Sequence, residues 1–102
     1  MKIYNIEFSK EARGDLEGIK NYIKNNLHEP EIAERLIFKI REETQKLKRY
    51  PNIYPMINEN KIREFKIRKL IVCNYIVFYI VEDDKIIITR ILHKKRNWIN
   101  LL

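Results

Sequence analysis

The sequence of 102 residues contains few of the residues that break or crosslink a chain. Its one cysteine excludes an internal disulfide, and sparse cysteine is typical of a reducing cytoplasm. Only two glycines and three prolines are present, which leaves little room for long loops. Cys73 lies within the apolar stretch LIVCNY, so we interpret it as a small buried hydrophobic residue rather than a reactive thiol.

The sequence also lacks the common marks of a ligand site or a membrane segment. Both glycines fall in the first predicted helix, so no glycine-rich phosphate loop is expected. The two histidines are far apart in the chain and one cysteine cannot supply a thiolate cluster, so we expect neither a metal nor a cofactor. The first eight residues alternate and carry charge, and the longest apolar run, residues 70–81, is short and contains Asn74. Neither a signal peptide nor a membrane span is therefore expected, and we predict a cytoplasmic protein.

Acidic residues are almost missing from two short segments. Residues 61–69, KIREFKIRK, contain five basic residues and one acid, and residues 90–96, RILHKKR, contain four basic residues and no acid. Each segment therefore carries +4 with histidine neutral, whereas the whole chain carries +7, so the remainder nets −1. This confinement favours a positive patch directed at a partner. The alternative is a solvated strand edge whose cations prevent aggregation.

The first half of the chain has the spacing of a strand followed by two helices. Tyr4, Ile6 and Phe8 alternate with polar residues, which indicates a strand. Ser9 has the character of an N-cap, and Pro30 suits the first turn of a second helix. Two later prolines, in RYPNIYP, end that helix. The apolar stripes that we expect to face a sheet comprise Ala12, Leu16, Ile19, Ile23, Leu36, Ile40 and Leu47.

The second half of the chain has the pattern of strands. Residues 74–81, NYIVFYIV, are apolar on both faces and indicate a central strand. The segment EDDK predicts a tight turn, after which KIIITRIL returns as the antiparallel partner. We therefore predict one α+β domain over residues 1–102, in the order β-α-α-β-β-β. A helical hairpin should pack on one face of a mainly antiparallel sheet.

Two residue types in the C-terminal part are candidates for direct chemistry. His93 is a possible general acid or base, because imidazole titrates near neutral pH and the neighbouring cations suit a phosphate. We favour the alternative that His93 is a polar strand end or a phosphate-contacting donor, since no carboxylate is at hand to orient it. Phe78 and Tyr79 are interpreted as core residues. Trp98 is compatible with a lid over the last strand or with a contact to a partner.

Several stretches together resemble one protein family over nearly the whole chain. They are DLEGIKNYI in the first helix, LKRYPNIYP after the second, and IRKLIVCNYIVFYIVEDDKIIITRILHKKRNW. In this order and spacing the chain resembles the RelE/ParE family of toxins from bacterial type II toxin–antitoxin systems. The family fold is the β-α-α-β-β-β arrangement predicted above from the residues.

The resemblance implies one of two activities. RelE-like members are ribosome-dependent mRNA endonucleases, whereas ParE-like members poison DNA gyrase. Members of both branches are neutralised by a small antitoxin that wraps the toxin, so a toxin–antitoxin hetero-oligomer is expected. The partners implied are thus an antitoxin and either gyrase or the ribosome with its mRNA.

Individual positions favour one branch over the other. In the nuclease branch, Lys66 and Arg68 would be the basic pair on the strands and Arg96 the terminal arginine. However, Ile76 stands where that branch has an arginine after the tyrosine of NY, and the RILHKKRNW ending looks closer to the ParE-like branch. The residues predicted to contact the target or nucleic acid are Arg63, Lys66, Arg68, Arg90, Lys94, Lys95, Arg96 and Trp98. His93 and Arg96 would be catalytic only in an endoribonuclease.

These observations lead to three functional hypotheses. The first is a toxin that inhibits growth by binding an essential target, with DNA gyrase favoured. The second is a ribosome-dependent mRNA endonuclease, and the third is a non-toxic basic nucleic-acid-binding module. Whether the protein is an enzyme is left open.

Overall fold

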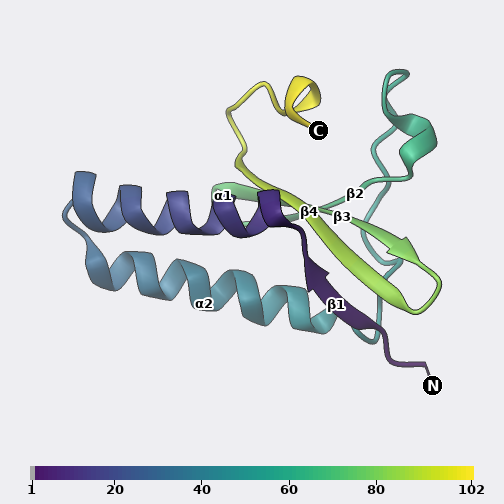
Figure 1. Ribbon diagram of the computed structural model, residues 1–102, viewed down its shortest axis with the longest axis horizontal. Helices are drawn as coiled ribbons and strands as arrows, with labels where there is room; N and C mark the ends of the chain where they lie inside the picture. The colour runs from purple at the N-terminus through teal and green to yellow at the C-terminus, as the bar shows by residue number, and fades with distance from the viewer. Residues whose placement is uncertain (1) are drawn as a thin grey trace.

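The computed structural model describes residues 2–102 and confirms the predicted α+β architecture. Strand β1 (Asn5–Phe8) leads into helix α1 (Lys10–Asn21), which continues as a π-helical turn, Tyr22–Asn26, and helix α2 (Pro30–Lys46) follows. Figure 1 shows the two helices lying side by side along the sheet, while the yellow C-terminal segment lies apart from them. Within residues 2–102, no helix combines the length and the apolar character that a membrane crossing requires.

Four strands form one mixed sheet in the order β1-β4-β3-β2. The last three strands are β2 (Arg68–Val72), β3 (Tyr75–Glu82) and β4 (Lys85–His93). The β2–β3 and β3–β4 pairs are antiparallel, as predicted, whereas β1 runs parallel to β4. The register pairs Tyr75 with His93 at one end of the β3–β4 hairpin, and it shifts between Phe78 and Tyr79.

The start of α1 shows why the helix begins where it does. The Ser9 hydroxyl accepts the backbone N–H of Ala12 at 3.0 Å, which confirms the predicted N-cap. The same hydroxyl donates to the carbonyl of Thr89 at 2.9 Å, and the Ser9 N–H donates to the carbonyl of Ile88. The cap thus also fastens α1 to β4. Pro30 is the first residue of α2, as predicted.

The helices cover one face of the sheet with a continuous apolar core. Alternate β3 residues, including Val77 and Tyr79, point into this core. Of the predicted stripe, five residues are buried and two are partly buried against the same cluster, which confirms the two-layer packing. The buried ones are Ala12, Ile23, Leu36, Ile40 and Leu47, and the partly buried ones are Leu16 and Ile19.

The opposite face of the sheet is apolar as well and is covered by other parts of the chain. Ile76 and Phe78 on β3 and Leu92 on β4 form a second buried cluster. The segment between α2 and β2 contributes Ile57, Ile62 and Ile67, and the C-terminal 3-10 helix Trp98–Leu101 packs against the same cluster. The predicted two-faced apolarity of β3 therefore reflects cover on both sides.

The tight turns correct one prediction. Cys73, expected in the core, is exposed, because it is the first of the two residues that join β2 to β3. Its φ of 55° lies in the left-handed region, as does the φ of 49° at Asp83 in the next hairpin. Cys73 lies at the end of the sheet, where no other layer covers it, so the apolar residues around it in the sequence do not imply burial.

Candidate functional site

The basic segment after β4 leaves the sheet through a short hydrogen-bonded turn. The Lys94 N–H donates to the carbonyl of Asn74 at 2.8 Å, and the Arg96 N–H donates to the carbonyl of His93 at 3.0 Å. The Lys95 N–H donates to Nδ1 of His93 at 3.1 Å. The side chains of Lys94, Lys95 and Arg96 are all exposed. The backbone is therefore anchored while three cationic side chains extend into solvent.

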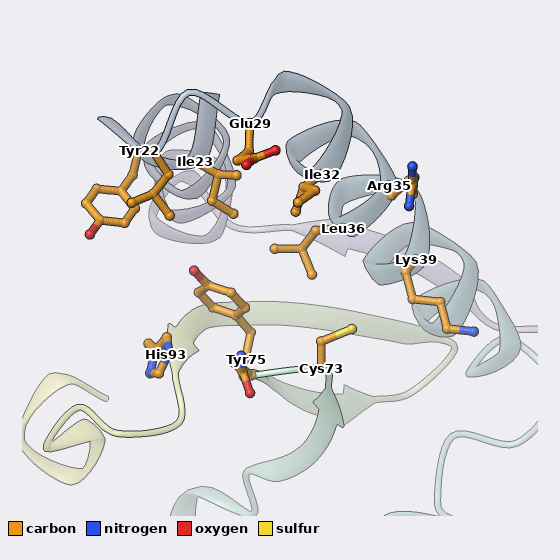
Figure 2. A pocket seen from close by; sticks show the side chains of 12 residues that line it. Tyr22, Ile23, Glu29, Ile32, Arg35, Leu36, Lys39, Cys73, Tyr75 and His93 are labelled. Atoms are coloured by element: carbon orange, nitrogen blue, oxygen red, sulfur yellow. The ribbon is translucent and has the colours of Figure 1, made fainter. Parts of the chain in front are cut away.

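An apolar groove of about 770 Å³ opens next to this turn. It lies between the helices and the ends of β3 and β4, and Figure 2 shows Ile23, Ile32 and Leu36 above Tyr75 and His93. Large apolar side chains on the helical side remain about half exposed: Tyr22 at 52%, Leu27 at 51% and Ile32 at 48%. A contiguous apolar surface of this kind is a candidate interaction site.

Charged side chains lie at the rim of the groove rather than at its floor. Arg35 and Lys39 line it along α2, and Glu29 lies near the start of that helix (Figure 2). With Lys94 to Arg96 close to His93, cations stand near both ends of the groove. An occupant with an apolar face and acidic flanks would match this surface.

His93 is held by packing and by a backbone donor. Its ring meets the ring of Tyr75 edge to face, with 5.2 Å between centroids and 77° between planes. Burial, and secondarily the nearby Tyr22, raises the pKa of the Tyr75 hydroxyl. Among residues 2–102, no carboxylate is hydrogen-bonded to the His93 ring. The arrangement that would orient a general base is therefore missing from the described part of the chain.

A second hollow, of about 550 Å³, continues from the groove around the edge of β4. Tyr22, Tyr75 and His93 line both hollows, and Arg96 and Asp15 line only the second. The structure therefore brings His93 and Arg96 to one surface.

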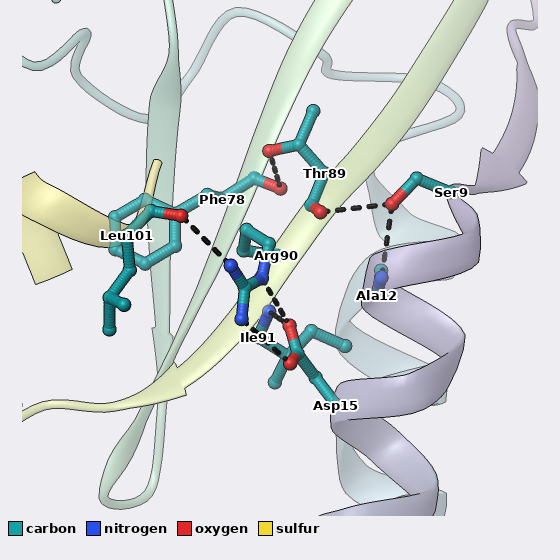
Figure 3. Close-up of polar contacts among 8 residues, drawn as sticks. All are labelled: Ser9, Ala12, Asp15, Phe78, Thr89, Arg90, Ile91 and Leu101. Atoms are coloured by element: carbon teal, nitrogen blue, oxygen red, sulfur yellow. Dashed lines mark hydrogen bonds and ion pairs between the residues drawn. The ribbon is translucent and has the colours of Figure 1, made fainter.

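Arg90 is used inside the fold. Its Nε and Nη2 atoms donate to the two carboxylate oxygens of Asp15 at 2.8 and 3.0 Å, and its Nη1 donates to the carbonyl of Leu101 at 2.8 Å. Asp15 also accepts the backbone N–H of Ile91 at 2.9 Å (Figure 3). This bidentate contact raises the pKa of Arg90 further above its ordinary value. Arg90 thus ties α1, β4 and the C-terminal segment together.

The cations of the other basic segment are also divided. Arg68 donates to the carbonyls of Asn52 and Tyr54 at 3.2 and 2.6 Å, and Arg63 donates to Asn60 Oδ1 at 2.7 Å. Lys66 was placed on a strand by the family resemblance, and that placement is wrong. It precedes β2, because it ends the 3-10 helix Arg63–Phe65 with a φ of 55°. Its side chain is exposed.

The strands of the two basic segments lie on opposite sides of β3. Strand β3 lies between β2 and β4, and Arg68 pairs with Tyr79, whereas His93 pairs with Tyr75 at the end of the same strand. The cations around Arg63 and Lys66 and those after His93 therefore leave the sheet at different places.

Trp98 lies over the sheet face that the helices do not cover. Its ring packs on Phe78 with 5.3 Å between centroids, and the ammonium of Lys69 lies 5.4 Å from the ring centre. Trp98 is therefore part of a lid on this face, over β3 rather than over the last strand, and its contact with a partner stays a prediction. Phe78 and Tyr79 are fully buried, as expected of core residues.

A comparison of the sequence with known protein families identifies the family of this chain. The sequence matches the family described as "ParE toxin of type II toxin-antitoxin system, parDE" over residues 6–98. The chain belongs to the ParE toxin family. The predicted resemblance to RelE/ParE toxins is therefore confirmed. No curated protein matches the sequence.

Two solved structures share the fold of this ParE-family toxin. A chain of the chromosomal ParDE toxin–antitoxin system from P. aeruginosa has a TM-score of 0.72 and 20% identity, over 89% of this chain and 96% of that one. A chain of the toxin–antitoxin complex RelBE2 from Mycobacterium tuberculosis has a TM-score of 0.62 and 18% identity, over 89% of this chain and 98% of that one. At these identities the likeness concerns the fold.

Ile76, the position that separates the two branches in sequence, is buried in this ParE-family toxin. Only 5% of it is exposed, and it packs beside Phe78 and Leu92 on the face covered by the C-terminal segment. A charged side chain could not be placed there without burying its charge. The local structure thus agrees with the apolar residue in the sequence.

The sequence analysis missed the groove of this toxin altogether. Neither Tyr22 nor Ile32 was predicted to be part of a site, because the apolar periodicity identifies only the stripes that cover the sheet. A signal was present, because Tyr22 and Ile32 are large apolar residues that belong to neither stripe. Lys69 was also missed, although strand alternation places it on the same face as Ile71.

Proposed function

We propose that this ParE-family toxin inhibits growth by binding DNA gyrase through Lys94, Lys95 and Arg96. The observation that carries the proposal is the contrast at the end of β4, where the backbone is fixed and three cations are free. Exposed cations on an anchored turn suit an acidic or polyanionic surface. The family membership supports growth inhibition, and it disfavours a non-toxic nucleic-acid-binding module.

The rival activity is cleavage of mRNA on the ribosome. It is favoured by one observation, that His93 and Arg96 line the same hollow. Two observations disfavour it: His93 lacks a hydrogen-bonded carboxylate among residues 2–102, and Ile76 offers no charge for a phosphate. We therefore rank binding to gyrase above cleavage.

A paired assay distinguishes the two targets. The purified toxin should inhibit supercoiling by gyrase and should leave mRNA on translating ribosomes intact. His93→Ala should change gyrase inhibition only modestly. A nuclease that used His93 for proton transfer would instead lose about 10²- to 10⁴-fold in cleavage rate. Ribosome-dependent cleavage without any effect on gyrase would refute the proposal.

Two charge-reversal variants, one in each basic segment, test which segment contacts the target. Replacing Lys94, Lys95 and Arg96 together by Glu should abolish gyrase inhibition and growth inhibition. The matched control replaces Lys61, Arg63 and Lys66 by Glu, an equal change of charge on exposed residues of the other basic segment. The control should retain inhibition, because its cations leave the sheet elsewhere. Equal loss in both variants would mean that only the total charge matters.

We further propose that a cognate antitoxin neutralises the toxin by filling the apolar groove in the cytoplasm. An amphipathic antitoxin segment with acidic flanks fits the half-exposed Leu27 and Ile32 and the cations at the rim. Apolar burial would supply most of the affinity, and charge complementarity would speed association.

The antitoxin proposal has its own test. The probe is the short acidic protein expected from the neighbouring reading frame. Leu27→Glu should weaken its binding by at least about tenfold, because the variant places a charge in a desolvated contact. The association rate should fall as salt is added. An association rate independent of salt, or full affinity in the variant, would contradict this binding mode.

A further inference from the structure

The outer side of α2, away from the sheet, presents a large apolar side chain that no other part of the chain covers. Phe38 is 67% exposed, more than any other large apolar side chain in residues 2–102. It lies near the middle of α2, and the exposed positions of this helix from residue 34 onward are otherwise polar. Beside it is a pocket of about 330 Å³ between α1 and α2, into which Leu16 and Ile37 contribute their apolar side chains.

The same pocket is bordered by a balanced set of charges. The four charged residues that line it are Glu17, Lys20, Glu34 and Arg41. None of them has an ion-pair partner among the residues that the structure describes. The neighbouring stripe of α2 differs, because Glu43 there binds Lys46 at 2.7 Å and lies 4.0 Å from Lys39. The side of Phe38 thus presents two acids and two bases that are not paired with one another or with other described residues.

We propose that this face of α2 binds the same face of a second copy of the chain across a two-fold axis. Glu34 and Arg41 lie seven residues apart, about two helical turns, with Phe38 between them. When two α2 helices pack antiparallel about the point between residues 37 and 38, each Glu34 meets Arg41 of the other copy. Phe38 of each copy then enters the pocket over Leu16 and Ile37 of the other.

The charge distribution favours a second copy over other occupants. The whole chain carries +7, so two copies repel each other on average, and their contact must lie on a neutral surface. Two acids and two bases make this face neutral, which suits neither nucleic acid nor an anionic membrane. The 17 residues of α2 span about 25 Å, so the interface is small. We expect a dissociation constant on the order of micromolar to tens of micromolar.

Sedimentation of the purified chain across the micromolar range tests the proposal. The wild-type protein should shift from monomer to dimer with concentration. Phe38→Ser should raise the dissociation constant at least about tenfold, because it removes the central aromatic anchor. The matched control is Phe65→Ser, since Phe65 is also exposed, at 59%, but lies on the 3-10 helix before β2. The control should dimerise like the wild type.

A charge exchange tests the two-fold geometry itself. Glu34→Arg alone should weaken the dimer, because each of the two contacts between residues 34 and 41 would then bring two arginines together. Arg41→Glu alone should weaken it as well, because each contact would bring two glutamates together. The double variant Glu34→Arg, Arg41→Glu exchanges the signs and should restore dimerisation. Circular dichroism should show all variants folded, since both side chains are exposed.

Three outcomes would overturn the proposal: a wild-type chain that stays monomeric, a dimer indifferent to Phe38→Ser, or a double variant no better than the single ones. None of these measurements depends on the target of the toxin, so failure here leaves the gyrase proposal intact.

Discussion

The two basic segments, residues 61–69 and 90–96, carry the same charge of +4, but in each of them only the cations outside the strands are exposed. In each segment, the arginine that lies in a strand is bonded within the fold: Arg68 to two loop carbonyls and Arg90 to Asp15. The lysines outside the strands are exposed. The difference shows that a strand fixes its side chains against neighbouring acceptors, whereas a chain that leaves the sheet exposes them. Charge in the sequence therefore overstates the charge that a partner meets.

The largest effect on stability is expected from breaking the Arg90 contacts. Arg90→Ala should lower the free energy of unfolding by about 2–3 kcal/mol, because it leaves the largely buried carboxylate of Asp15 without its cation. The matched change Lys95→Ala should stay within about 0.5 kcal/mol. Urea unfolding measures both. Similar losses of unfolding free energy in the two variants would contradict the distinction between cations that are bonded within the fold and cations that are exposed.

Alkaline pH should lower the free energy of unfolding, because the buried Tyr79 hydroxyl beside Arg68 titrates at a higher pH in the folded state. Burial raises the pKa of Tyr79 from 10.0 to about 12, and the Arg68 cation opposes that rise. Below pH 10 the hydroxyl is neutral in both states and donates to the carbonyl of Pro51 at 2.8 Å when folded. Above pH 10 the unfolded state releases its proton first, so stability falls, by about 2 kcal/mol at pH 12.

The control for this pH dependence is Tyr79→Phe. The variant lacks the titrating hydroxyl and should lose less stability between pH 10 and pH 12 than the wild type. Arg68→Met should lose more, because removing the cation raises the pKa of Tyr79 further. The assignment to Tyr79 fails if urea unfolding gives the same slope for wild type and Tyr79→Phe.

A smaller effect is expected from the hydrogen bonds of Arg68 at neutral pH. Arg68→Ala removes two donations to the loop after α2 and should cost about 1–2 kcal/mol. Lys66→Ala, two residues earlier, removes only an exposed side chain and should be near neutral. Thermal unfolding of the two variants measures the difference. Equal melting temperatures would contradict a stabilising role for the Arg68 hydrogen bonds.

The smallest effect is expected at Lys69. This side chain is partly buried beside the Trp98 ring, so it is intermediate between the hydrogen-bonded arginines and the exposed lysines. Lys69→Met removes the ammonium near the Trp98 ring but keeps the aliphatic stem, so it should cost about 0.5 kcal/mol. Trp98 is the one tryptophan in the chain, so its fluorescence reports the change locally. An unchanged emission spectrum in the variant would mean that the lysine does not contact the ring in solution.

The sequence by itself determined the elements and the core of this protein. Periodicity identified the stripes that include Ile40 and Leu47, the N-cap at Ser9 and the β3–β4 hairpin, because each depends on neighbours within a few residues. It also carried the family resemblance that the comparison confirmed. Local spacing is sufficient for such features, since burial of an apolar stripe follows from its repeat.

Only the tertiary structure decided which side chains are available to a partner. Asp15 reaches Arg90 from 75 residues away, and Arg68 reaches carbonyls 14 and 16 residues before it, so no local pattern distinguishes these arginines from free ones. The groove likewise combines Ile32 of α2 with Tyr75 of β3. Cys73 was misassigned for the same kind of reason, because its exposure follows from the turn that the paired strands require. Such contacts depend on distances in space, which sequence spacing does not fix.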